Sequence, residues 1–187
     1  SQVIDLEGRI EIKDDDGITI TTEVLHLDLL TGKTFGNKKV TISMDQGSNL
    51  IASAFTIVEK DGKGFFEGPI NMKIVKNNSM NDNIDISSDR LEIDKISNML
   101  IFIGNVNIKE KKSVINAKKM VVWFEEDKKN KIGSVFRNDI KRIEFFGNVK
   151  MENNKRGESL VGDNAVYNPK EEKLYINNNV ELKKNEN

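Results

Sequence analysis

One strand-like segment recurs six times along this chain, and it constrains the fold more than any other feature. Its clearest copies span residues 101–108 and 144–151, which read IFIGNVNI and EFFGNVKM. Weaker copies place the residue equivalent to this glycine at positions 8, 36, 68 and 178, so the interval varies from 28 to 43 residues. Self-similarity of this kind predicts supersecondary units stacked side by side, which build a long surface or groove and not a compact catalytic pocket.

Apolar and polar residues alternate with period two in nearly every segment. In residues 101–109, for example, Phe102, Val106 and Ile108 share one face, while the opposite face is polar at its end. This pattern is typical of antiparallel strands with one buried and one solvated face. The recurring glycine falls on the apolar face in mid-strand, where it predicts a bend or bulge that curves the sheet.

Segments of a second type lie between these copies, for example residues 84–93 and 114–124. Each has a small or polar middle, and in several of them the alternation slips by one residue there, which suggests a β-bulge. Turn residues such as Asp61-Gly62 and Asn168-Pro169 separate the strands. We therefore predict about eleven strands of two alternating types, and no helix.

The composition argues against several classes of function. The 187 residues have a formal net charge of −1 with acids and bases interspersed, which disfavours a nucleic-acid-binding protein. The chain has no cysteine, and its single histidine, His26, has no second histidine for a metal pair or catalytic triad, so we expect it on the surface. Because no nucleophile, zinc-protease or phosphate-loop motif is present, we expect no catalytic residue, no metal site and no cofactor.

The ordered series of motifs resembles the OstA-like family of periplasmic lipopolysaccharide-transport proteins, which includes LptA and LptC. The LptA-like elements lie in about residues 84–183, and they include Ser88-Asp89-Arg90-Leu91, Gly104-Asn105-Val106 and Gly162-Asp163-Asn164-Ala165. Gly17-Ile18 and Phe66-x-Gly68 look like the C-terminal half of LptC. The resemblance implies two units, residues 1–76 and 84–187. These could form one continuous jellyroll or two hinged ones, with the polar run 77–83 as a hairpin loop or a linker.

The resemblance also implies a fold and a function. The fold is an all-β antiparallel β-jellyroll shaped like a taco shell, with repeated strand pairs and an open hydrophobic groove. The function is non-enzymatic binding and transport of lipopolysaccharide across the periplasm, as part of a bridge between inner and outer membranes. The implied partners are the lipid A acyl chains and other Lpt-type jellyroll proteins that pair through edge strands, with head-to-tail stacking of copies as one form. We expect any signal peptide or membrane anchor to lie before Ser1.

We predict that inward apolar side chains of the recurring strands line the groove. Each methylene removed from water contributes about 0.8 kcal/mol, and such contacts are non-directional, so they hold acyl chains without fixed stopping points. The predicted lipid-binding residues are Phe66, Ile70, Met72, Phe102, Val106, Ile108, Phe145, Val149, Met151, Ile176, Val180 and Leu182. The same side chains could instead form the packed core of a structural β-repeat scaffold that assembles through its edge strands, and the residues alone leave both readings open.

Overall fold

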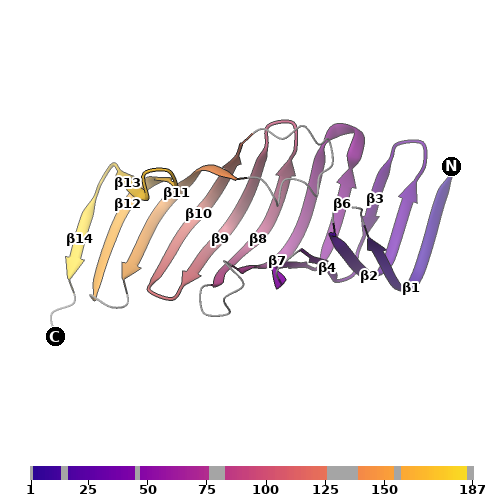
Figure 1. Ribbon diagram of the computed structural model, residues 1–187, viewed down its shortest axis with the longest axis horizontal. Helices are drawn as coiled ribbons and strands as arrows, with labels where there is room; N and C mark the ends of the chain where they lie inside the picture. The colour runs from indigo at the N-terminus through magenta and orange to yellow at the C-terminus, as the bar shows by residue number, and fades with distance from the viewer. Residues whose placement is uncertain are drawn as a thin grey trace.

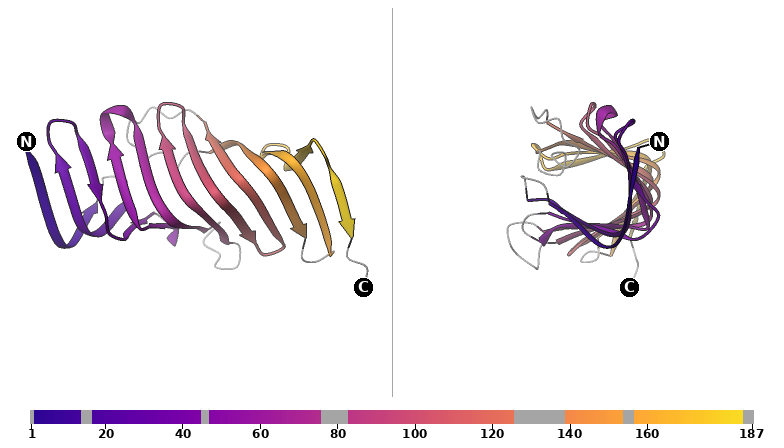
Figure 2. Two further views of the ribbon diagram at one scale, coloured as in Figure 1. Left: turned by 180° about the vertical axis from the view of Figure 1, so that it is seen from behind. Right: turned by 90° about the vertical axis from the view of Figure 1, so that its right-hand side faces the viewer.

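The computed structural model describes residues 2–13, 17–44, 47–75, 83–125, 139–153 and 157–184. They form a 14-stranded antiparallel sheet that coils along one axis, with the two termini at opposite ends (Figure 1). Seen along that axis, the coil is C-shaped, with a concave interior that is open on one side (Figure 2). The predicted all-β antiparallel jellyroll is confirmed.

The strands follow one another along the axis, and from β7 onward each long strand pairs with the next as a hairpin. A short 3-10 turn, η2 (Glu59–Asp61), joins β6 to β7. No helix among the described residues has the length and apolar character needed to span a membrane. The strands are β1 (Val3–Lys13), β2 (Thr19–Asp28), β3 (Lys33–Gly36), β4 (Val40–Ser43), β5 (Asn49–Ala52), β6 (Ala54–Val58), β7 (Lys63–Val75), β8 (Asn83–Asp94), β9 (Met99–Glu110), β10 (Ser113–Phe124), β11 (Ile140–Asn153), β12 (Glu158–Asn168), β13 (Lys173–Asn177) and β14 (Glu181–Lys184).

Each long strand bends in its middle, so its two halves lie in two walls that meet at a corner. In β2, residues Thr19 to Thr22 pair with β4, and residues His26 to Asp28 pair with β3. We call the wall that contains β3, β6 and β13 the upper wall, and the wall that contains β4, β5 and β14 the lower wall. The corner also explains why there are more strands than predicted, because three predicted strands are each divided there, into β3 and β4, β5 and β6, and β13 and β14.

The recurring Gly-Asn pair forms this corner. Gly104, Asn105, Gly147 and Asn148 all have positive φ, between 46° and 78°. At both pairs the register with the neighbouring strand shifts. Between the paired positions on either side of the corner, the Gly-Asn strand has one residue more than its neighbour. A bulge of this kind bends a strand and increases its twist. The predicted bend at the recurring glycine is therefore confirmed.

The glycines of these pairs do not face the interior as predicted. A Cβ added to Gly104 would overlap the carboxylate of Asp89, and one added to Gly147 would lie 2.9 Å from Cδ of Lys118. Asp89 and Lys118 are both exposed. The positive φ turns the Cα–Cβ direction toward the convex side, so these glycines leave no space in the interior.

We expect Asn105→Ala to lower the free energy of unfolding by about 1–2 kcal/mol, because alanine is strained in the left-handed conformation that asparagine tolerates. The substitution also removes the hydrogen bond that Asn105 Nδ2 donates to Asp89 Oδ2 at 2.9 Å. Asn105→Gly keeps the backbone conformation and should lose less. Urea denaturation of the two variants checks this, and equal losses would mean that the hydrogen bond, and not the backbone, stabilises the corner.

The predicted one-residue slip in the alternation of buried and exposed side chains, in the middle of the second type of strand, is also confirmed. Ser88 and Leu91 in β8 are both buried although they are three residues apart, as are Ala117 and Met120 in β10. In the Gly-Asn strands the buried residues on either side of the corner are four apart instead. The two spacings compensate at each corner, and inward side chains of neighbouring strands therefore stay in register.

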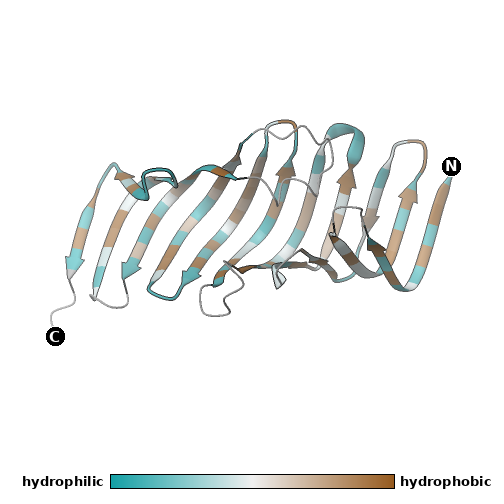
Figure 3. Ribbon diagram, in the orientation of Figure 1, coloured by the Kyte–Doolittle hydropathy of each residue, from teal (hydrophilic) through white to brown (hydrophobic). Residues whose placement is uncertain are grey.

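Hydrophobic and hydrophilic residues alternate along the strands (Figure 3). The strand registers align the inward residues of neighbouring strands in rows that cross the sheet. The upper row lies next to the corner in the upper wall, and the lower row lies in the lower wall. The upper row comprises Gly36, Phe55, Phe66, Leu91, Phe102, Met120, Phe145, Ala165 and Ile176. The lower row comprises Ile12, Ile20, Ile42, Leu50, Met72, Ile86, Ile108, Ile115, Met151, Leu160 and Leu182.

The buried carboxylate of Asp94 ties β8 to β7 at the rim of the upper wall. It forms an ion pair with Lys63 and accepts a hydrogen bond from the Ser97 backbone N–H at 3.0 Å. Burial alone would raise the pKa of Asp94, but the bonds from Lys63 and Ser97 outweigh it and hold the pKa below the usual 3.8.

A carboxylate with a lowered folded-state pKa stabilises the fold above its unfolded pKa, and this contribution is lost as the pH falls through the folded value. We therefore expect Asp94→Asn to lower the free energy of unfolding at pH 7, and the difference from the unsubstituted protein to shrink below about pH 4. Denaturant titrations at pH 7 and pH 3 check this. A difference that does not change with pH would contradict it.

Candidate functional site

The interior of the coil offers apolar contacts to a ligand. All residues of the lower row are aliphatic or methionine, and the upper row adds phenylalanine, so aromatic side chains lie in only one of these two rows. Two polar side chains at the corner, Thr22 and Ser88, are buried. Their hydroxyls donate to the carbonyls of Val24 at 3.4 Å and Arg90 at 3.0 Å, so neither needs a partner from a ligand. Such a surface suits an uncharged aliphatic ligand.

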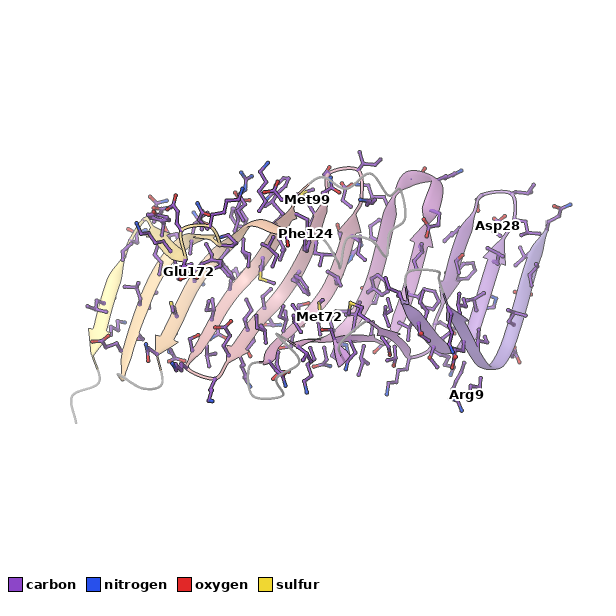
Figure 4. The ribbon with its side chains drawn as sticks, in the orientation of Figure 1. Arg9, Asp28, Met72, Met99, Phe124 and Glu172 are labelled. Carbon is purple, nitrogen blue, oxygen red and sulfur yellow. The ribbon has the colours of Figure 1, made fainter. Side chains whose placement is uncertain are left out.

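The structure places the predicted lipid-binding residues on the two walls, with different degrees of exposure. Met151 and Ile176 are half-buried, and Val180 and Leu182 are exposed near the C-terminal end. In Figure 4, Met72 lies within the coil whereas Arg9 lies on its outside. The buried members, which belong to one core cluster, are Phe66, Ile70, Met72, Phe102, Val106, Ile108, Phe145 and Val149.

The prediction omitted the inward side chains of the second type of strand. Leu91 and Ile93 in β8, and Met120 and Val122 in β10, are buried in the same core cluster. They occupy the upper wall between strands of the first type, opposite residues such as Phe102. The alternation in these segments would have identified them if the one-residue slip had been applied to their second halves.

Over the middle of the molecule, the inward side chains are buried. Phe66, Leu91, Phe102 and Val149 are at most 1% exposed. At the two ends of the coil, by contrast, inward apolar side chains are exposed, among them Leu6 in β1. The interior is therefore a packed core at its centre and an open apolar surface at its ends.

Two hollows lie outside this interior. One, of about 700 Å³, is at the outer corner near the N-terminal end, between Glu7 and Arg9 of β1 and Glu23 of β2. The other, of about 290 Å³, lies on the outer face of the lower wall, beside Asn71 and Asn107. Charged, amide and hydroxyl side chains make up most of both linings, and Met72 and Ile86 of the lower row also border the second hollow.

His26 is half-buried on the outer face of the upper wall. Its Nδ1 lies 2.6 Å from Asp5 Oδ1 on β1, and its ring stacks on Phe35 of β3 with the centroids 4.8 Å apart. His26 therefore lies at the surface as expected, and the contact with Asp5 and the stacked ring of Phe35 cover it in part. Within the described ranges, no three His, Cys, Asp or Glu side chains are grouped so that they could hold a metal ion.

Three comparisons relate this chain to known proteins. A family model described as "LptA/(LptD N-terminal domain) LPS transport protein" matches residues 85–187, which is more than half of the chain. No curated protein matches. Among solved structures, the chain is similar to LptH from Pseudomonas aeruginosa, described as the LptA homologous periplasmic component of the conserved lipopolysaccharide transport device.

The similarity to LptH has a TM-score of 0.52 at 9% sequence identity, and it covers 74% of this chain and 95% of that chain. At so low an identity the likeness concerns the fold alone. The family match is independent of it and falls on β8 to β14, where the Gly-Asn corners are most regular.

Proposed function

This chain belongs to the LptA/LptD N-terminal family of lipopolysaccharide transport proteins, and we propose that it holds the lipid A acyl chains of lipopolysaccharide against its interior walls. The observation that carries this proposal is the lower row, which runs without a polar interruption from Ile12 in β1 to Leu182 in β14. It provides one apolar path along the whole coil.

The physical role of such a path is to replace the bilayer while the lipid crosses water. Each exposed methylene is unfavourable by about 0.8 kcal/mol, so a chain of about twelve carbons left in water loses roughly 10 kcal/mol. Neighbouring members of the lower row are similar aliphatic side chains one strand spacing apart, about 4.8 Å. A chain that moves by one strand therefore exchanges one set of contacts for an equivalent set. Transport of this kind needs no catalytic residue and no cofactor.

The two predicted units, residues 1–76 and 84–187, act in this proposal as one continuous trough. The pairing of β7 with β8 supports this, because it extends from Lys63 opposite Asp94 to Val75 opposite Asn83. Both rows cross this pair without interruption. The polar run 77–83 lies outside the described residues except for Asn83.

The edges of the coil suit the predicted partners. Among the residues that the structure describes, β1 pairs only with β2 at one end, and β13 and β14 pair only with β12 at the other. Strands with an unpaired side template pairing with another chain. We therefore propose that further Lpt-type jellyrolls, or copies of this chain stacked head to tail, add to these edges. We also propose a location in the periplasm, with any tether to the inner membrane outside these residues.

A second candidate function is a structural scaffold with a closed core. The near-complete burial of Phe66, Phe102 and Val149 favours it, because a filled interior has no room for a lipid unless the walls separate. This candidate predicts self-association through the edge strands without lipid uptake.

Site-specific photo-crosslinking to purified lipopolysaccharide separates the two candidates. The photoreactive residue replaces inward Met151 or Leu160, and the controls are their outward sequence neighbours Lys150 and Ser159. Lipid transport predicts crosslinks at the inward positions alone. If folded protein gives no crosslink at either inward position, the interior does not admit lipid, and the scaffold function replaces the transport function.

A further inference from the structure

The exposure of the lower row changes along the coil. Leu50, Met72 and Ile108 are at most 8% exposed, whereas Met151 and Leu160 are half-buried. Leu182, at the end of the row, is 61% exposed. These residues all lie in one row of one wall, so their exposure depends on what covers them and not on which face of the strand they occupy.

The upper wall opens over the same strands. Above the upper row, toward the rim, a further inward row runs across β8 to β13. Its members Leu100 and Val122 are at most 5% exposed, whereas Tyr167 and Leu174 are half-buried. Both walls therefore lose their cover toward the C-terminal end.

The corner between the walls stays closed over these strands. Phe145, Val149 and Ala165 are at most 2% exposed. In the upper row, Phe145 of β11 is followed by Ala165 of β12. A small side chain therefore follows a large one where the walls open. The result is a wedge that is closed at the corner and open between the walls.

The N-terminal end differs from this arrangement. In the lower row Ile12 is 40% exposed and Ile20 is half-buried, but Ile42 in β4 is already buried. The exposed part of the row thus reaches less far into the coil there than at the other end, where it extends back to Ile115 in β10. The asymmetry shows that the C-terminal opening is more than the usual exposure of an edge strand.

We propose that the acyl chains of the bound lipid rest in this C-terminal wedge, between β10 and β14, and that they enter the interior from β4 to β9 only when that part opens during transport. This inference rests on the proposed function. An uncharged aliphatic chain is the occupant because the lower wall of the wedge presents aliphatic side chains and methionine, to which the upper wall adds Leu174 and Tyr167. The wedge also lies wholly within residues 85–187, which match a family of lipopolysaccharide transport proteins. In the closed part, a ligand would first have to displace side chains that are already buried, such as Leu50 and Met72.

The test uses single-cysteine variants, since the chain has no cysteine of its own. The lower row supplies matched pairs of one residue type, one member in the closed part and one in the wedge: Leu50→Cys with Leu160→Cys, and Met72→Cys with Met151→Cys. Alkylation rates are measured without lipid and with purified lipopolysaccharide. A third pair, Ile86→Cys with Ile115→Cys, replaces any pair in which circular dichroism shows that a variant is unfolded.

Without lipid, we expect the wedge thiols to react about tenfold faster than their partners, because buried thiols react only through local opening. Purified lipopolysaccharide should slow the wedge thiols by about the same factor and leave the closed ones unchanged. The fully deacylated saccharide should protect none of them. Equal protection at Leu50→Cys and Leu160→Cys would overturn the wedge but leave lipid transport intact. No protection at any position, together with no inward photo-crosslink, would overturn both proposals.

Discussion

Phe102→Ala is expected to lower the free energy of unfolding by about 3–5 kcal/mol, the usual range for removing a buried phenylalanine. Phe102 is 1% exposed and stands in the upper row between Leu91 of β8 and Met120 of β10. Neighbouring side chains are fixed by two packed walls, so they can fill little of the space that the ring leaves. Because small domains are stable by only about 5–15 kcal/mol, this one substitution should bring the protein close to unfolding at room temperature.

The matched control is Phe146→Ala. Phe146 lies on the outer face, is 38% exposed, and has the Lys119 ammonium 5.9 Å from its ring centroid. An exposed cation–π contact contributes about 0.5–1 kcal/mol, so the loss should stay near that value. Guanidinium denaturation followed by circular dichroism compares the two variants. Similar losses would mean that the centre of the interior is not packed, which would remove the basis for distinguishing a closed part from the wedge.

The local sequence pattern was sufficient to predict the faces of the strands and the position of the bend. Period-two alternation assigned Phe102 and Val106 to the interior correctly, because it reflects which face of a single strand is buried. The recurring Gly-Asn pair marked the corner, since both residues tolerate the left-handed backbone that the bend needs.

The division of three strands at the corner could not be predicted in this way. β3 and β4 both pair with β2, one in each wall, and β5 and β6 both pair with β7. Which neighbour a segment pairs with is decided by contacts between distant parts of the chain. Alternation within residues 34–42 or 50–57 contains no information about that choice.

The degree of closure of the site was also beyond the sequence. The alternation is as regular around Met151 as around Met72, yet Met72 is buried and Met151 is half-buried. The difference arises from the distance between two walls and from the size of side chains in neighbouring strands, such as Ala165 beside Phe145. The sequence therefore identified the apolar surface but could not show which part of it is accessible to a lipid.

The second large effect is expected at Gly36, at the end of β3. A Cβ at this position would lie 2.5 Å from the carbonyl oxygen of Val24 and 2.7 Å from Cε1 of Phe55. The first of these neighbours is backbone of β2, which cannot move without disturbing its pairing with β3, and the second is a buried ring of the upper row. We expect Gly36→Ala to lower the free energy of unfolding by about 1–3 kcal/mol, the range found for overpacking a core.

Gly64→Ala supplies a control with the opposite sign. Gly64 is buried in β7 of the same wall, and an added Cβ would lie 3.4 Å from Ile93 Cβ and from Phe66 Cε2, which are ordinary van der Waals distances. Where the backbone accepts alanine, the substitution stabilises a protein by about 0.4–1 kcal/mol through the entropy of the unfolded chain. Urea denaturation should therefore rank the proteins with Gly64→Ala at or above the unsubstituted protein and Gly36→Ala well below it. Equal stability of the two variants would show that β3 does not approach Val24 so closely. The division of this strand between the two walls would then need a different physical cause.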